Sequence, residues 1–145
     1  MLKRIYVVVA ETVDTPLTET TVVQIPGRMA AQAVHAASRM RMYRLLIEGS
    51  KLFKRNKGDY ADVEAAMTDL AGEAITTIIL SARDSRELEH VRRLLAKAKI
   101  KYATFEDTND AVYGPGAVVT ALATVPVLPN KVNGILDYLP LWTPR

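Results

Sequence analysis

Four polar side chains share one stripe of the longest helical pattern in the sequence. They are spaced four, three and four residues apart: Arg28, Gln32, His35 and Arg39. At about 100° per residue this spacing puts them on one face of a helix. The opposite face carries apolar residues: Ala30, Ala33, Val34 and Ala37. Free backbone N–H groups and the dipole at a helix start favour an anion. The pattern therefore predicts either an anion site near Arg28 or an ordinary amphipathic helix with a solvated face.

The acidic pair Glu106-Asp107 is a second candidate for chemistry, because it ends a strand-like run over residues 100–105. An Asp at a strand end can act as a general base toward water or orient a cation, and it can equally cap a turn. Sites in open α/β sheets gather beyond the carboxyl ends of strands. We therefore expect Asp107 and the loop into Arg28 to meet at one edge. The turn Gly114-Pro115-Gly116 reaches that edge only if the strand after it is antiparallel.

Several kinds of site are disfavoured by composition. The chain has no cysteine, and its two histidines, His35 and His90, lack the spacing of a zinc site. No phosphate-binding glycine loop and no Gly-x-Ser-x-Gly elbow is present. No apolar run approaches the roughly 20 residues that cross a bilayer, and the first ten residues resemble a strand more than a signal peptide. We expect a soluble cytoplasmic protein with no metal and no cofactor.

Basic charge is concentrated in one segment. Residues 28–58 hold eight Lys or Arg and one acid, which gives +7 against −4 for the remainder of a chain whose net charge is +3. Such asymmetry indicates a polyanion partner, or a basic surface that keeps the protein soluble.

Strand and helix patterns alternate, which predicts an α/β fold in a single domain, residues 1–145. Strands are expected at 3–10, 74–80, 100–105 and 117–125, and helices at 28–48, 60–70, 84–98 and 128–138. Gly49-Ser50 is expected to end the long helix, and Asp84 or Ser85 to cap a later one. Residues 11–25 are expected to form a loop with a short extended piece at 20–25. The segments 74–80, 84–98 and 100–105 predict a right-handed βαβ unit.

The sequence resembles a known family at two places. Gly27-Arg28-Met29-Ala30-Ala31-Gln32-Ala33-Val34-His35-Ala36-Ala37, after an Ile-Tyr-Val-Val-Val strand, is similar to the opening of the archaeal and eukaryotic (type two) peptidyl-tRNA hydrolases. That family has Gly-Lys-hydrophobe-Ala-Ala-Gln-x-x-His-Ala-Ala there. The second place is Glu106-Asp107, eight residues before Pro115-Gly116, with Leu122-Ala123 and Pro126 following. The order of elements agrees over nearly the whole chain.

The resemblance implies a four-stranded mixed β-sheet flanked by helices, often dimeric, that cleaves the ester between a peptide and tRNA without metal. The catalytic lysine of the family falls on Arg28 and its aspartate on Asp107. The strand threonine of the family falls on Thr120 when counted back from Leu122-Ala123-Pro126, and on Val119 when counted forward from Pro115-Gly116. The two counts differ by one residue, so an insertion or bulge is expected near residues 117–118. Gln32 would donate hydrogen bonds, and His35 would support them or stack on the terminal adenosine.

Two functional hypotheses follow. In the first, the chain is a peptidyl-tRNA hydrolase, and a basic set grips the RNA backbone: Arg39, Arg41, Arg44, Lys51, Lys54, Arg55 and Lys57. In the second, it is an inactive relative that binds tRNA, another anion or a protein, as the arginine at position 28 and two lost family threonines, now Ala111 and Ala117, suggest. A purely structural homodimer module is a third reading.

Overall fold

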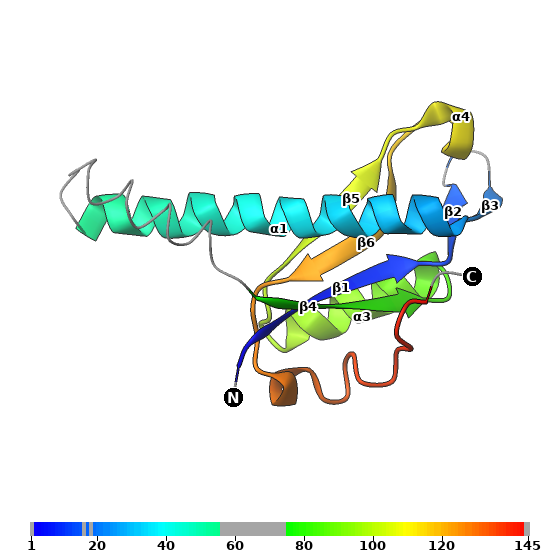
Figure 1. Ribbon diagram of the computed structural model, residues 1–145. Helices are drawn as coiled ribbons and strands as arrows, with labels where there is room; N and C mark the ends of the chain where they lie inside the picture. Colours follow the sequence, from blue (N-terminus) through cyan, green and yellow to red (C-terminus); the bar gives the residue numbers. More distant parts are fainter. Residues whose placement is uncertain (1, 16, 18, 56–74, 144–145) are drawn as a thin grey trace.

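The computed structural model describes residues 2–15, 17, 19–55 and 75–143, with the backbone alone at 49, 50, 52–55 and 110. A four-stranded sheet in the order β4-β1-β6-β5 forms its centre (Figure 1). The strands are β1 (Arg4–Ala10), β4 (Thr76–Ala82), β5 (Tyr102–Asp107) and β6 (Val118–Thr124). The predicted mixed sheet is therefore confirmed, with each strand within about two residues of its expected bounds.

The strand directions bring the predicted site residues to one edge. β1 is parallel to β4 and antiparallel to β6, and β5 is antiparallel to β6. The carboxyl ends of β1, β4 and β5 consequently lie at the same edge as the first residue of β6. This antiparallel β6 is the condition under which the turn Gly114-Pro115-Gly116 reaches that edge, and it is met. β4 and β5 are parallel strands joined through a helix, with β1 and β6 between them.

Helix α1 (Pro26–Arg55) covers one face of the sheet and extends past its end (Figure 1). Its buried stripe is Met29, Ala33, Ala36 and Met40, which pack against β1 and β6. The expected apolar side was therefore wrong in part, because Val34 is 63% exposed. The face of α1 that packs on the sheet is rotated from the expected one, away from Val34 and toward Gln32, which is buried.

The expected end of this helix at Gly49-Ser50 is also wrong, since α1 continues to Arg55. Gly49 stays helical and does not adopt the left-handed conformation of a helix cap. A glycine inside a helix costs only about 1 kcal/mol relative to alanine. The good helix formers after Gly49 offset a cost of that size.

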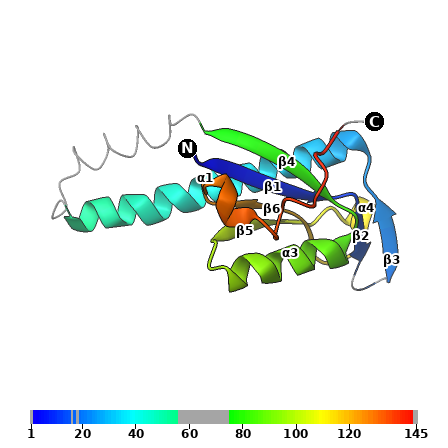
Figure 2. The ribbon, with the colours of Figure 1, turned by 90° about the horizontal axis from the view of Figure 1, so that it is seen from below.

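Helix α3 (Ser85–Lys97) packs on the opposite face (Figure 2). As predicted, Asp84 caps it, accepting from the backbone N–H of Glu87 at 2.8 Å. Its inward residues Leu88, Val91 and Leu95 are buried, and Leu94 is partly so. They share a core with β1 and with the segment after β6.

Three connecting segments differ from expectation. Within residues 11–25, β2 (Thr12–Thr15) and β3 (Thr20–Val23) pair as an antiparallel hairpin, which suits their β-branched residues. The expected loop after β5 contains a short helix, α4 (Asp110–Tyr113). The expected helix over 128–138 is only the 3₁₀ turn η1 (Pro129–Val132), because Gly134 has a left-handed φ of 78°.

The predicted helix over residues 60–70 lies outside the described residues. Residues 51–58, which the sequence predicts as a basic connector after the helix, belong to α1 as far as Arg55, and 56–58 lie outside the description. Among the helices that are described, none has the length and hydropathy needed to span a membrane.

Candidate active site

Asp107 and Gln32 are joined by a hydrogen bond at the edge where the strands end. Gln32 lies in the second turn of α1 and Asp107 is the last residue of β5. The Gln32 Nε2 donates to Asp107 Oδ2 at 2.5 Å, although the residues are 75 positions apart. The other oxygen, Oδ1, accepts the backbone N–H of Asn109 at 2.9 Å. Asp107 therefore caps its turn, as one of the two readings of this residue predicts, and it also contacts α1. Its role as a general base stays a prediction.

Tyr113 connects this pair to the loop that precedes α1. Its hydroxyl donates to Gln24 Oε1 at 2.7 Å and accepts from Gln32 Nε2 at 3.3 Å. Gln24 Nε2 in turn donates to the carbonyl of Ala10, the last residue of β1, at 2.8 Å. Tyr113, Gln24 and Gln32 are all at least 95% buried. A continuous hydrogen-bonded chain thus runs from the end of β1 to the end of β5, and it fixes the orientation of the Gln32 amide toward Asp107.

The positive charge of Arg28 acts on the same Tyr113 side chain. Its guanidinium carbon lies 6.0 Å from the centre of the Tyr113 ring, within the range of a cation–π contact. Burial raises the pKa of Tyr113, and the charge of Asp107 raises it further, while the Gln32 hydrogen bond and the charge of Arg28 oppose that shift. Tyr113 is consequently a neutral phenol at neutral pH. Arg28, Gln32 and Asp107 all act on this one ring, so three predicted site residues are brought together.

Two buried polar atoms of the predicted site have no hydrogen-bond partner within the described residues. They are Gln32 Oε1 and Thr120 Oγ1. Both N–H bonds of the Gln32 amide are directed to Asp107 and Tyr113, so its carbonyl oxygen is the group left over. Buried polar atoms without partners are rare in folded proteins, and each requires an explanation such as a bound water, an ion or a catalytic role.

Thr120 occupies an irregularity in β6. Val119 pairs with Glu106 and Ala121 with Phe105, so Thr120 is the extra residue of a β-bulge. The bulge expected near residues 117–118 is present but lies at Thr120, two to three positions later. A bulge next to the end of β5 accounts for the one-residue difference between the two ways of aligning the family threonine.

His35 lies further along α1 and contacts the sheet edge instead of Asp107. Its exposed ring stacks on Phe105 with ring centres 4.6 Å apart and an angle of 22° between the rings. The guanidinium carbon of Arg39 lies 5.6 Å from the centre of the same Phe105 ring. The predicted stripe therefore divides in two. Arg28 and Gln32 join the buried network, and His35 and Arg39 form a surface contact with Phe105 beside it.

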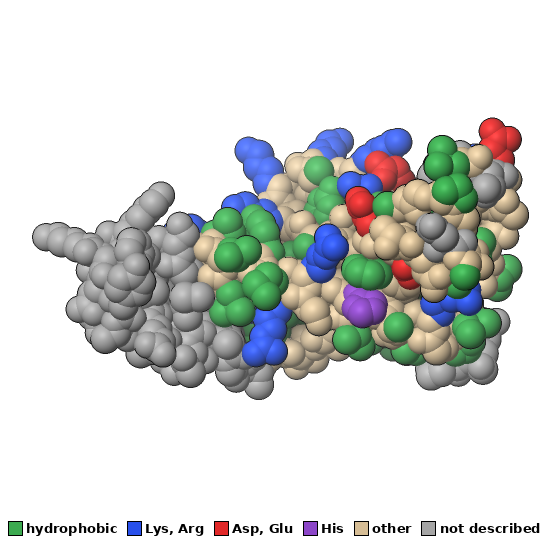
Figure 3. Space-filling view, turned by 90° about the horizontal axis from the view of Figure 1, so that it is seen from above, with side chains coloured by type: hydrophobic (Ala, Val, Ile, Leu, Met, Phe, Trp, Pro, Cys, Tyr) green, Lys and Arg blue, Asp and Glu red, His purple; other side chains and the backbone are tan. Residues whose placement is uncertain are grey.

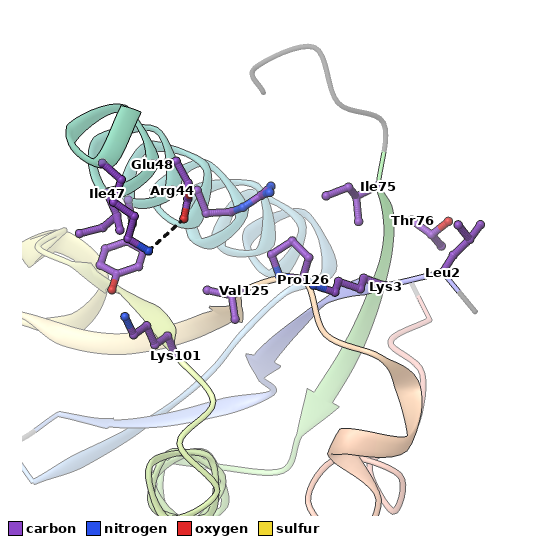
Figure 4. Close-up of a pocket in the computed structure, with 12 residues that line it drawn as sticks. Leu2, Lys3, Arg44, Ile47, Glu48, Ile75, Thr76, Lys101, Val125 and Pro126 are labelled. Carbon is purple, nitrogen blue, oxygen red and sulfur yellow. Dashed lines mark ion pairs between the residues drawn. The ribbon is translucent and has the colours of Figure 1, made fainter. Parts of the chain in front are cut away.

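The described side chains of the predicted basic set lie along α1: Arg39, Arg41, Arg44 and Lys51. Lys and Arg side chains on this face of the molecule are blue in Figure 3. Arg44 and Lys51 line a groove of about 560 Å³ between α1 and the amino ends of β1, β4 and β5, where Lys3 and Lys101 join them (Figure 4). Glu48 pairs with Lys51 at 3.5 Å. Arg39 and Arg41 are exposed. The side chains of Lys54 and Arg55, and Lys57 as a whole, lie outside the description.

Four residues that the structure places beside the predicted site and basic residues were not themselves predicted: Gln24, Tyr113, Phe105 and Lys101. Two of them could have been noticed by position: Tyr113 is an aromatic residue directly before Gly114-Pro115-Gly116, and Phe105 is one two residues before Asp107. Nothing in the local sequence distinguishes such residues from ordinary core or loop positions.

In the described part of the chain, no three His, Asp or Glu side chains gather closely enough to hold a metal ion. No curated protein matches the sequence significantly. A family model does: the one described as Peptidyl-tRNA hydrolase PTH2 matches residues 9–142, a span that contains all of the α1–β5–β6 edge. With its fold and the convergence of Arg28, Gln32 and Asp107, the chain belongs to the PTH2 family of peptidyl-tRNA hydrolases.

Proposed function

We propose that this protein hydrolyses the ester bond between a peptide, or an N-blocked amino acid, and tRNA. The observation that carries the proposal is the hydrogen bond from Gln32 to Asp107 at the carboxyl edge of the sheet. It holds the Asp107 carboxylate in a fixed orientation, and the charges of Asp107 and Arg28 both act on the Tyr113 ring beside it. An oriented carboxylate can act as the general base, and a cation in the same group can stabilise an oxyanion.

In the proposed mechanism Asp107 accepts a proton from a water molecule as that water attacks the ester carbonyl carbon. The carbonyl oxygen becomes an oxyanion in the tetrahedral intermediate. When the intermediate collapses, the bond from carbon to the ribose oxygen breaks, and the ribose oxygen takes the proton back from Asp107. The products are a free carboxylic acid and tRNA with a terminal ribose hydroxyl. Gln32 orients Asp107 for this step through the hydrogen bond from its amide N–H.

Arg28 and Thr120 are assigned supporting roles. The guanidinium of Arg28 stabilises the oxyanion or holds the terminal phosphate, and it does not exchange a proton near neutral pH. The first backbone N–H groups of α1 add a favourable field for the same negative charge. The family resemblance assigns Thr120 a hydrogen bond to the substrate; its hydroxyl is fully buried without a partner among the described residues, so this role requires the β6 bulge to open when the substrate binds. His35, whose exposed ring is stacked on Phe105, keeps the two alternative roles that the resemblance implies: support of these hydrogen bonds or stacking on the terminal adenosine.

RNA would extend from this site along α1. Arg28 and Arg44 are 16 positions apart, which is about 24 Å along a helix at 1.5 Å per residue. The groove that contains Arg44, Lys51, Lys3 and Lys101 therefore lies at the distance of an RNA stem rather than of the terminal nucleotide. Binding through such contacts weakens steeply as salt increases.

The test is single-turnover hydrolysis of N-acetyl-aminoacyl-tRNA by the parent protein, by Asp107→Asn and by Glu106→Gln. Glu106 is exposed and adjacent to Asp107, so its substitution makes the same change of charge one residue away. We expect at least a hundredfold loss for Asp107→Asn and little change for Glu106→Gln. Full activity of Asp107→Asn, with its fold intact by circular dichroism, overturns the proposal.

The second candidate is an RNA-binding relative without activity. The observation that favours it is Arg28, which contacts the Tyr113 ring where the family has lysine. In that case tRNA binds and no ester is cleaved even at high protein concentration. A single domain over residues 1–145 and a cytoplasmic location are proposed from the pattern and composition of the sequence, and a homodimer is proposed from the family resemblance alone.

A further inference from the structure

A groove of about 670 Å³ begins beside the candidate active site and follows the outer edge of the sheet. One wall is the flank of α1, with His35, Arg39, Met42 and Leu46 at successive turns. The other wall is β5. Phe105 lines it two residues before Asp107, so this end of the groove lies beside the site.

The wall formed by β5 exposes backbone as well as side chains. β5 is the last strand of the order β4-β1-β6-β5, so among the described strands one of its sides has no neighbour. Side chains alternate between the two faces of a strand, so a groove over one face would contact every second residue. All four consecutive residues from Tyr102 to Phe105 line this groove. It therefore runs along the strand's edge, where N–H and C=O groups can pair with an added strand.

We propose that this groove binds the peptide part of peptidyl-tRNA as an extra strand, parallel to β5. The inference rests on the proposed function, because it needs an ester at Asp107. β5 runs toward Asp107, and the ester is at the carboxyl end of the peptide. A peptide whose carboxyl end reaches Asp107 must therefore run in the same direction as β5. Four residues of strand extend about 13 Å, which matches about four residues of peptide.

Pairing with backbone suits a substrate whose peptide can have any sequence. Main-chain hydrogen bonds give affinity without reading side chains, whereas specificity comes from side-chain pockets. The helix wall offers large apolar groups that tolerate varied side chains, with Met42 59% and Leu46 64% exposed.

The charge of the groove favours peptide over RNA. Of the ten described residues that line it, Arg39 alone carries a permanent charge. The groove at the other end of the sheet contains Lys3, Arg44, Lys51 and Lys101. A phosphate backbone, which is bound mainly through its charge, is better matched to that second groove.

The test measures kcat/KM of the parent protein for substrates that share one tRNA and one C-terminal residue. The series runs from N-acetyl-aminoacyl-tRNA to N-acetyl-hexapeptidyl-tRNA. We expect kcat/KM to rise about tenfold overall and to level off at four to five residues. N-methylation of single amides should lower it about three- to tenfold at every second position and leave the positions between unchanged, because only alternate residues of a strand face its partner.

Two variants and a matched control locate the effect. Leu46→Gln and Met42→Gln should reduce the gain from peptide length by at least half. Val34→Gln should keep it, since Val34 is equally exposed on α1 at 63% and does not line the groove.

Each other outcome overturns the inference in a recognisable way. If kcat/KM does not change with peptide length while N-acetyl-aminoacyl-tRNA is still cleaved, the groove does not bind the peptide, and the proposed hydrolase function stands. If Leu46→Gln instead weakens the binding of deacylated tRNA, the groove holds RNA. If kcat/KM does not change with peptide length and Leu46→Gln changes the oligomeric state in sedimentation, the groove holds a second copy of this chain. If no substrate of the series is cleaved, the proposed function fails and the inference fails with it.

Discussion

Gln32 Nε2 lies 2.5 Å from Asp107 Oδ2 and 3.3 Å from the hydroxyl of Tyr113, so one amide nitrogen orients both a carboxylate and a phenol. The helix that carries Gln32 and the strand that carries Asp107 are joined there by side chains alone. Under the proposed mechanism, the direction in which Asp107 faces the substrate depends on this amide.

Gln32→Glu should shift the acid limb of the pH–rate profile to higher pH. The substitution puts a second carboxyl beside Asp107, and two neighbouring carboxylates cannot both ionise easily, so the apparent pKa of the pair rises. The measurement is kcat/KM for N-acetyl-aminoacyl-tRNA against pH. Gln32→Met, which removes the amide without adding charge, should lower kcat about ten- to hundredfold with no such shift. An unmoved profile for Gln32→Glu would show that residue 32 does not contact the general base.

Tyr113→Phe should lower the free energy of unfolding at neutral pH by about 1–3 kcal/mol, because Gln24 Oε1 and a Gln32 N–H lose their partner in a buried place. Its alkaline behaviour should also differ. Burial raises the pKa of Tyr113 in the folded protein above the ordinary value of 10.0. The stabilisation is therefore complete below pH 10 and is lost as pH rises through the folded pKa. Urea unfolding from pH 8 to 11 should show a shallower alkaline loss in Tyr113→Phe than in the parent, and equal slopes would contradict this.

Thr120→Val should separate stability from activity. The Oγ1 atom is buried without a partner, so an isosteric methyl group should leave the stability unchanged or raise it. If the hydroxyl binds substrate, kcat/KM should fall about tenfold or more. Thermal unfolding and single-turnover hydrolysis on the same preparation test both parts. A clear loss of stability would mean that the hydroxyl has an internal partner in solution.

Arg28→Lys should retain activity within about tenfold of the parent, because it keeps the positive charge at the position where the family has lysine. Arg28→Gln should lose about a hundredfold or more, as expected when a charge near a developing oxyanion is removed. Single-turnover rates at saturating protein give the comparison. Equal rates for Arg28→Gln and the parent would exclude Arg28 from the reaction.

Lys101→Gln should make tRNA binding less dependent on salt. Lys101 lines the basic groove, and each phosphate contact contributes about 0.7–0.9 to the slope of log K against log salt. The control is Lys131→Gln, an equal change of charge at an exposed residue of η1, outside that groove. Filter binding from 50 to 300 mM salt measures both slopes. An identical decrease in the two would mean that only net charge matters.

Much of the fold could be predicted from local pattern. The β-branched runs that became β1 and β4, and the amphipathic spacing of α3 with its Asp84 cap, are decided within a few residues of chain. Prediction failed where distant packing decides. The sheet selects which stripe of α1 is buried, so Val34 is exposed and Gln32 is not. Gly134 ended the last helix through a backbone angle that composition does not reveal.

The candidate site was predictable only in its parts. Arg28, Gln32 and Asp107 stand out because their types and positions carry a family pattern. Tyr113 and Gln24 do not, because their role arises from partners 81 and 89 residues away. The bulge was indicated by a one-residue mismatch, but the exact residue, Thr120, depends on how β6 pairs with β5.

The chain of hydrogen bonds from Ala10 to Asp107 also bears on how the protein folds. Its members come from β1, the segment between β3 and α1, α1 itself, α4 and β5, so it closes only after contacts across 75 to 89 residues have formed. Closing loops of that length is the slow part of folding for mixed topologies. During refolding, the helical signal should therefore recover first, and catalytic competence should return in the last kinetic phase.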